Sequence, residues 1–305
     1  MTIEWFALLL AAAVPLAAPL LFAALGEVIS ETAGVINIEL EGMMLVGAFT
    51  GVAGALMSGD LIVAFTAALV GGVLVATLQG VACFIFGANQ VVAGIVLNIL
   101  ALGATTFLLV SALGADVTRA VVTLTPLPIP LLSDIPLIGK ALFSQNIVVY
   151  LAYLAVPVVW YLIAKTRFGL TLKSVGEKPA AAEAMGVDVV RTRWIALLLC
   201  GALAGIGGGL LTLGGLGVFT PNITKGIGFI ALAAVIFGRW KPVGAFGAVM
   251  LFSLVDAFQI RAQALGLPVP YQLLVALPYV VTLLALALFV SKMRPPAALA
   301  INFEK

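Results

Sequence analysis

Residues 194–217 read WIALLLCGALAGIGGGLLTLGGLG, an apolar run without a single charged side chain. A helix that spans a bilayer needs roughly 20 mostly apolar residues, so this run is long enough to cross one. Gly201, Gly205 and Gly209 recur at every fourth position and share one helix face, where small residues let helix backbones approach closely in lipid. The stretch predicts a membrane helix packed inside a bundle.

The rest of the chain extends this pattern. Of 305 residues, 63% are hydrophobic and 9% are charged, and the mean hydropathy is +1.25, which is too apolar for a water-soluble globule. The fold class is therefore all-α, a polytopic membrane bundle of about eight or nine spans that forms a single domain over residues 1–305. The expected spans are 5–25, 33–57, 61–86, 90–113, 146–164, 194–217, 226–238, 243–260 and 271–291. The seventh is short, which predicts a broken or re-entrant helix paired with the eighth.

The distribution of basic residues predicts the orientation. Six of the fifteen Lys and Arg residues lie in the loop 165–193. If this loop is cytoplasmic, alternation places eleven basic residues inside and four outside, namely Arg119, Lys140, Lys225 and Arg261. That bias follows the positive-inside rule and predicts a cytoplasmic C-terminus, with an external N-terminus on nine crossings.

Two long connections differ in character. The external loop 114–146 contains Pro126, Pro128, Pro130 and Pro136, which favours a stiff extended cover over a folded domain. The cytoplasmic loop 165–193 contains a predicted short helix from Pro179 to Met185, ended by Gly186. Proline at the start and glycine just past the end are typical of helix boundaries.

Polar side chains interrupt the second span. Asn37, Glu39 and Glu41 precede or open its apolar run. Such groups are costly in lipid unless a partner, a cavity or an interfacial position compensates. Two interpretations follow: the acids lie at the membrane surface near a positive helix N-terminus, or they border a translocation path through a broken helix.

A second polar set opens the fourth span, with Asn89, Gln90 and Asn98. Gln90 and Asn98 are eight residues apart, a little over two helical turns, so their amides are expected on the same side of the helix. Amides of this kind hydrogen-bond a polar solute in a pore, or clamp neighbouring helices together.

Several absences narrow the function. The sequence has no histidine, which removes Ser-His and Cys-His nucleophile pairs, and Cys83 and Cys200 both lie in apolar runs. It has no G-x-x-x-x-G-K-[ST] phosphate loop, so the chain carries no ATP site of that type. Asp256 is the only other acid deep in an expected span, which gives proton-coupled transport little support. We therefore expect a chain that is neither an enzyme nor a metal protein.

Four stretches together resemble a known family: GEVISETAGVINIELEGMMLVGAF, GANQVVAGIVLNIL, VGEKPAAAEAMGVDVVRTRWIALLLCGALAGIGGG and GIGFIALAAVIFGRWKPVGAFGA. They are similar to permeases of bacterial ABC importers for branched-chain amino acids, ribose and nucleosides, and most of all to the nucleoside or simple-sugar permeases. The resemblance covers about residues 26–290.

The resemblance implies a heteromeric importer in the bacterial inner membrane. Its other members would be a second related permease, a cytoplasmic ATPase that holds ATP and Mg, and an extracytoplasmic binding lipoprotein or periplasmic protein. This chain would hold no cofactor, would contact membrane lipid and would bind no nucleic-acid polymer. Within the loop 165–193, the segment that would couple to the ATPase contains Gly176, Glu177, Pro179, Glu183, Ala184 and Gly186.

The resemblance favours nucleosides as the transported class. Simple sugars such as ribose and branched-chain amino acids are the alternatives within the family. An ion-coupled secondary transporter is the alternative outside it. On any of these interpretations, the pathway candidates are Asn37, Glu39, Glu41, Asn89, Gln90 and Asn98.

Overall fold

The computed structural model describes residues 3–112, 120–136, 138–265, 270–289 and 294–303, and most of these residues are helical. The long helices are α1 (Ile3–Thr32), α2 (Leu40–Ser58), α3 (Leu61–Gly80), α4 (Gln90–Ala112), α6 (Ile147–Lys165), α9 (Val189–Leu211), α11 (Pro242–Ala264) and α12 (Tyr271–Phe289). Shorter helices are α5 (Gly139–Phe143), α7 (Arg167–Glu177), α8 (Pro179–Ala184) and α10 (Ile227–Phe237), and two π-helical turns, η1 (Val81–Ile85) and η2 (Thr212–Leu216), extend α3 and α9.

This arrangement confirms the polytopic bundle. Among the described residues, seven helices are long and apolar enough to cross a membrane, and α12 is a further apolar helix of 19 residues. At 11 residues, α10 is only about 17 Å long, against an apolar layer of about 30 Å, so it cannot span alone, as expected for the seventh segment. It packs against α11, its expected partner.

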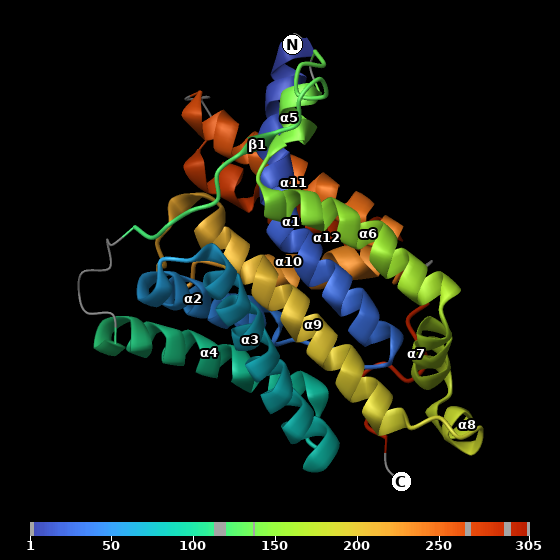
Figure 1. Ribbon diagram of the computed structural model, residues 1–305. Coiled ribbons are helices and arrows are strands. Elements are labelled where there is room, and N and C mark those ends of the chain that lie inside the picture. Colours follow the sequence, from blue (N-terminus) through green and yellow to red (C-terminus); the bar gives the residue numbers. More distant parts are fainter. Residues whose placement is uncertain (1–2, 113–119, 137, 266–269, 290–293, 304–305) are drawn as a thin grey trace.

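The central helices pack through glycine. Helix α9 runs diagonally through the molecule beside α1 (Figure 1) and also packs against α2 and α3. A Cβ added at Gly205 would lie 2.3 Å from the Ala68 carbonyl oxygen, and one at Gly201 would lie 2.7 Å from the Gly72 oxygen. The glycine ladder therefore brings the backbones of α3 and α9 into contact, which confirms its packing role.

Three expected boundaries were wrong, and one helix was not predicted. Helix α1 continues to Thr32, because its charged last turns are buried against other elements. The second span starts at Leu40, because residues 33–39 are not helical. The loop 165–193 contains α7 in addition to α8, since Thr166 caps a helix that buries Leu172 and Val175. Helix α9 starts five residues early, because the Asp188 carboxylate accepts a hydrogen bond from the Arg191 N–H.

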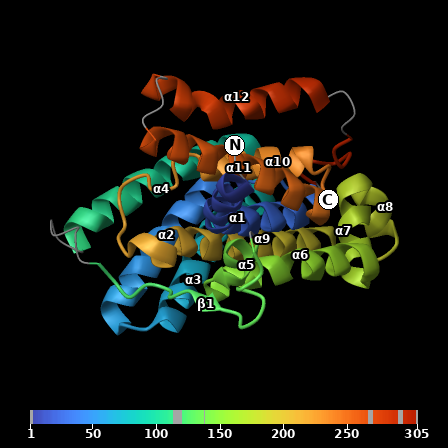
Figure 2. The ribbon, with the colours of Figure 1, turned by 90° about the horizontal axis from the view of Figure 1, so that it is seen from above.

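The two ends of the bundle are distinct. The first turns of α1 lie beside α5 at one end, and α7, α8 and the C-terminal segment lie at the other (Figure 1). Seen from above, α12 runs along one edge and α6 lies on the opposite side of α1 (Figure 2). The external loop has no helix over 120–129 and turns over 130–136, with a two-residue ladder between β1 (Leu127–Pro128) and β2 (Ser144–Gln145). Arg119, Lys292 and Lys305 lie outside the described residues, so their predicted sides stay predictions.

Residues 294–303 form a C-terminal strap across the end that carries α7 and α8. The Ala298 N–H donates to the Gly176 carbonyl (2.8 Å) and the Ala300 N–H to the Gly34 carbonyl (3.2 Å). The buried Arg193 guanidinium donates to the Ile301 carbonyl (2.8 Å). The Asn302 amide donates to the carbonyls of Gly87 and Ala88 and accepts from the Gln90 side chain. The strap joins segments that are far apart in the sequence.

The orientation predicts a labelling pattern. Single cysteines at Ser174 in α7 and at the exposed Ala297 in the strap should react with a membrane-impermeant thiol reagent only after the cells are opened, because both positions lie at the basic end. Ser58→Cys, in the exposed α2–α3 turn at the opposite end, should react in intact cells. The native Cys83 and Cys200 are buried and should give little background. Labelling of Ser174→Cys in intact cells would show that this end faces outward, opposite to the predicted orientation.

Candidate functional site

The connection between α1 and α2 contains the first polar cluster. Asn37 is fully buried, its backbone N–H donates to one oxygen of the Glu27 carboxylate (3.0 Å), and its side-chain amide donates to the other (2.7 Å). The Cys200 thiol of α9 also donates to Glu27 (3.3 Å). Glu27 was not among the residues expected from the sequence. It pins the broken segment 33–39 to α1 and α9.

The side-chain amides of Gln90 and Asn98 in α4 form hydrogen bonds with the backbone of residues 36–42. The Gln90 side-chain oxygen accepts from the Ile36 N–H (3.0 Å). The Asn98 oxygen accepts from the Gly42 N–H (2.7 Å), and its amide donates to the Ile38 carbonyl (2.8 Å). The two amides thus face one side of α4, as their spacing predicted. Both are engaged by protein, which favours the helix-clamp interpretation. Asn89 is exposed and caps α4 by accepting from the N–H groups of Val91 and Val92.

Glu39 differs from these neighbours. It is fully buried, and neither of its carboxyl oxygens has a hydrogen-bond partner among the described residues. It lies against Gly94 of α4, where an added Cβ would come within 3.0 Å of the carboxyl oxygen. A buried carboxyl group without a partner is costly, so Glu39 contributes no evident stability to the fold. Among the six pathway candidates, Glu39 is the one whose side chain makes no hydrogen bond to the described residues.

Glu41 joins two helix starts. Its carboxylate accepts hydrogen bonds from the Thr224 hydroxyl (2.5 Å) and from the N–H groups of Gly226 and Gly228 (both 2.7 Å). Those two N–H groups belong to the first turn of α10, where a negative charge is stabilised by the helix dipole. Because Glu41 itself lies in the first turn of α2, the interrupted ends of α2 and α10 meet at this carboxylate.

A cavity with an apolar lining and four polar residues opens beside this junction and was largely missed from the sequence. It has a volume of about 410 Å³, within the range of small-molecule sites, and lies between α1, α10, α11 and α12. Its polar lining residues are Lys225, Ser253, Asp256 and Gln259. Ser253, Asp256 and Ile260 follow each other at helical spacing on α11, which is the signal that could have found it. The cavity offers both donors and acceptors to a polar solute.

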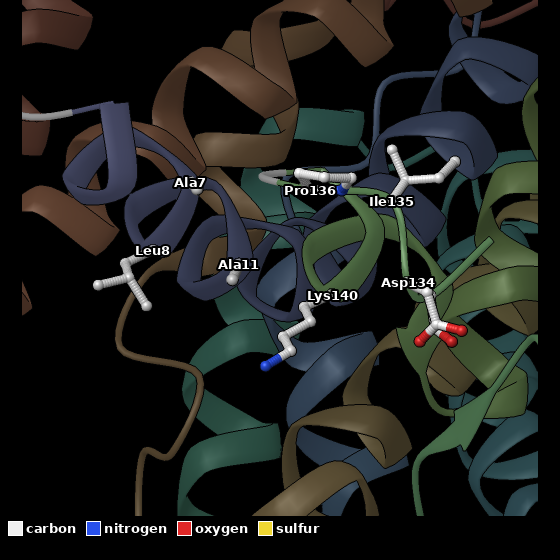
Figure 3. A pocket seen from close by; sticks show the side chains of 8 residues that line it. Ala7, Leu8, Ala11, Asp134, Ile135, Pro136 and Lys140 are labelled. Carbon is white, nitrogen blue, oxygen red and sulfur yellow. The ribbon is translucent and has the colours of Figure 1, made fainter. Parts of the chain in front are cut away.

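A second cavity, of about 550 Å³, lies at the external end (Figure 3). Ala7, Leu8 and Ala11 of α1 form one wall, and residues 133–136 with Lys140 form the other. The charged groups of Asp134 and Lys140 point in different directions in this view. The proline-rich segment thus packs on the start of α1 as a cover, and its mostly apolar lining contains none of the pathway candidates.

The predicted coupling segment is a surface feature at the basic end. Helix α8 begins at Pro179, and Gly186 has a left-handed backbone (φ 84°) whose N–H donates to the Glu183 carbonyl (2.8 Å). Glu177, Glu183, Ala184 and Gly186 are exposed. Met185, which was not among the expected residues, is 85% exposed and places an apolar side chain at the tip. Gly176 is instead buried against the Thr32 carbonyl at the end of α1.

The bundle, with the ends of α2 and α10 meeting at Glu41 and a short exposed helix at the basic end, is that of a multi-pass membrane protein. Residues 9–289 match the family described as the permease component of branched-chain amino acid transport systems, and the chain belongs to this family.

Three relatives extend the comparison. The chain is 38% identical to the guanosine ABC transporter permease protein NupQ of Bacillus subtilis, over 95% of this chain and 94% of the relative. It is 38% identical to the nucleoside ABC transporter permease protein NupC of Lactococcus lactis, over 94% and 93%. It is 39% identical to the putative glucose ABC transporter permease protein TsgC13 of Haloferax volcanii, over 85% and 79%. All three are permease subunits of transporters.

Proposed function

We propose that this chain is the membrane-spanning subunit of an ABC importer that carries nucleosides, with ATP and Mg bound by a partner ATPase. The observation that carries the proposal is its 38% identity, over nearly the full length of both chains, to permeases named for guanosine and nucleosides. The absent phosphate loop supports a division of labour, in which this chain forms the path and a partner supplies the energy. A second related permease and an extracytoplasmic binding protein complete the proposed complex.

Reconstitution tests the division of labour. Liposomes containing this chain alone should neither hydrolyse ATP nor accumulate guanosine. Liposomes that also contain the proposed ATPase, second permease and binding protein should accumulate guanosine when ATP is enclosed on the ATPase side. ATP-dependent uptake by the chain alone would refute the proposal. Gradient-driven uptake that is abolished by a protonophore would favour the ion-coupled alternative.

Simple sugars are the second candidate class, because the relative named as a putative glucose permease is equally similar in sequence. Competition separates the two classes in the same assay. Unlabelled inosine or adenosine should reduce labelled guanosine uptake, whereas ribose, glucose and leucine at the same concentration should not. Preferential competition by a sugar would reassign the substrate and leave the ABC-importer architecture intact.

We further propose that α8 docks on the ATPase. Its exposed tip combines Glu183, Ala184 and Met185. The preceding helix α7 is attached to the bundle at Gly176, which accepts a hydrogen bond from Ala298 of the strap and packs against the Thr32 carbonyl of α1. A short helix that packs through Ala182 against Val175 of α7 and Val189 of α9 can pass movement of the ATPase to α1 and to the broken segment that follows it. Glu177, Pro179 and Gly186 define the ends of this helix and its adjoining turns.

The coupling proposal predicts a specific defect in Gly186→Val. A β-branched residue is strongly disfavoured at φ 84°, at a cost of about 1–2 kcal/mol, so the turn after α8 should rearrange. We expect normal membrane insertion but several-fold lower recovery of the ATPase by co-purification. Glu183→Lys should act in the same direction, more mildly, through altered interface charge.

Gly59→Val is the matched control for this variant. Gly59 is also left-handed (φ 68°) with open space around it, but it lies in the α2–α3 turn at the opposite end. It should leave ATPase recovery unchanged. Normal ATPase association and guanosine-stimulated hydrolysis in both Gly186→Val and Glu183→Lys would show that α8 is only a connector.

A further inference from the structure

A third cavity lies at the basic end, apart from the pathway candidates. It has a volume of about 630 Å³ and is bounded by the last turns of α6, by α7, by the α10–α11 turn and by the start of the strap. Its lining residues are Thr32, Trp160, Ile163, Ala164, Lys173, Glu177, Arg239, Trp240, Lys241, Pro242, Val243, Gly244, Arg294 and Pro296. The cavity opens where α6 ends and α11 begins, at the predicted cytoplasmic surface.

Its charge is strongly one-sided. Lys173 from α7, Arg239 and Lys241 from the α10–α11 turn and Arg294 from the strap supply four cations, and all four are exposed. Glu177 is the single acid among the lining residues. Three separate segments thus supply four positive charges to one cavity, against the single negative charge of Glu177. This balance favours an anionic ligand.

Its walls are apolar. Trp160 and Ile163 come from the last turns of α6, and Val243 comes from the first turn of α11. Trp160 is 43% exposed and Val243 is 58% exposed, so both present apolar surface outward from the bundle. Tryptophan is enriched at the membrane–water boundary, where one side of the ring meets lipid and the other meets water. The cavity therefore combines four exposed cations with exposed apolar side chains of α6 and α11.

The turn that carries two of the cations is held in an unusual conformation. Arg239 (φ 53°) and Trp240 (φ 55°) are consecutive left-handed residues, which is rare for large side chains and costs of order 1–3 kcal/mol each. The Trp240 indole N–H donates to the buried Glu31 carboxylate, and this hydrogen bond attaches the turn to α1. Gly238 and Gly244 pack backbone to backbone across it. The rigid turn directs Arg239 and Lys241 toward the cavity.

We propose that this cavity binds the phosphate headgroup of an anionic phospholipid from the cytoplasmic leaflet, with the acyl chains lying along α6 and α11. The cations would hold the phosphate, and Trp160 with Val243 would contact the upper acyl chain. Basic cavities between membrane helices on the cytoplasmic side are suited to such headgroups. The proposal depends on the orientation set by charge and is independent of which solute is carried.

The test compares lipids that differ only in headgroup charge. The purified full-length chain in a neutral detergent is titrated with phosphatidylglycerol, with phosphatidylcholine of the same acyl chains, or with inorganic phosphate, and bound lipid is followed by native mass spectrometry and by the thermal midpoint. Phosphatidylglycerol should bind at least about tenfold more tightly than phosphatidylcholine and should raise the midpoint. Inorganic phosphate alone should do neither at the same concentration.

Charge-removal variants locate the site. Arg239→Asn with Lys241→Gln should weaken phosphatidylglycerol binding by about tenfold or more, because each basic residue near an anionic lipid is worth about 1 kcal/mol. Asparagine is chosen since it tolerates the left-handed conformation. If that pair disturbs folding, Lys173→Gln with Arg294→Gln gives the same test without touching the turn. The matched control, Arg167→Gln with Arg191→Gln, removes two exposed cations that do not line the cavity and should change binding less than about twofold.

Four results would overturn the proposal. Equal binding of the two lipids, or equal weakening by the control pair, would show that no headgroup site exists here. Full stabilisation by inorganic phosphate would mean a site for free anions. Normal phosphatidylglycerol binding by the cavity variants, together with lost co-purification of the ATPase, would assign the cations to a protein interface.

Discussion

Glu41→Ala should unfold the junction between α2 and α10 and abolish uptake. The variant removes a carboxylate that accepts three hydrogen bonds and leaves the buried N–H group of Gly228 and the buried Thr224 hydroxyl without an acceptor. Hydrogen bonds to a charged group contribute about 1.5–3 kcal/mol each, so we expect a loss of about 3–6 kcal/mol in the free energy of unfolding. That is a large fraction of the total stability of an ordinary domain.

The measurement is the thermal unfolding midpoint of the purified chain in detergent, with uptake measured in parallel. Glu41→Gln keeps one acceptor oxygen and should fall between Glu41→Ala and the native chain. Asp134→Ala removes an exposed acid and should leave the midpoint unchanged. A native midpoint in Glu41→Ala, with uptake lost, would show instead that Glu41 acts on the solute and is dispensable for the fold.

Gly208→Val should prevent the bundle from assembling. A Cβ at Gly208 of α9 would lie 1.9 Å from the Met44 carbonyl oxygen and 2.7 Å from the Met44 carbonyl carbon, so the obstacle is the backbone of α2. Side-chain rotation cannot relieve this contact, and the two helices would have to separate. Overpacking commonly costs 1–3 kcal/mol, and with a backbone obstacle we expect more than about 3 kcal/mol.

Gly247→Val provides the matched comparison. Gly247 lies within α11, so the change in helix propensity is similar, but no heavy atom lies within 4 Å of an added Cβ. The amount of chain recovered from membranes and its elution as a single species in detergent should be near native for Gly247→Val and strongly reduced for Gly208→Val. Equal recovery of the two variants would mean that α2 and α9 do not approach as closely as the structure shows.

Local sequence patterns predicted the elements whose determinants are themselves local. The length and apolarity of the runs at 61–86 and 90–113 marked α3 and α4, and Pro179 with Gly186 marked the ends of α8 to within a residue or two. The eight-residue spacing of Gln90 and Asn98 predicted that their amides share a face. These signals depend on helix periodicity and capping, which a sequence displays directly.

The features that escaped prediction depend on distant partners. The charged end of α1 resembles a loop, and it is helical because Glu27 meets Asn37 and Cys200 while Glu31 meets Trp240. Helix α7 is an exception, because its Thr166 cap and its apolar face with Leu172 and Val175 are local signals that the loop prediction did not use. The partners of Asn98 and Glu41 belong to interrupted backbone whose position no periodicity reveals. Whether the six pathway candidates contact solute stays a prediction.

The C-terminal strap also has a consequence for biosynthesis. Residues 294–303 leave the ribosome after every described helix, yet they provide the partners of Gly34, Gly87, Gly176 and Arg193. Residues 1–293 are therefore synthesised while these groups at the predicted cytoplasmic end are still open to water and to other proteins. Helix α7, which precedes the proposed ATPase-docking helix α8, gains its hydrogen bond from Ala298 only after the strap has been translated. A chain that stops before residue 294 would present α7 and the end of α1 without these contacts.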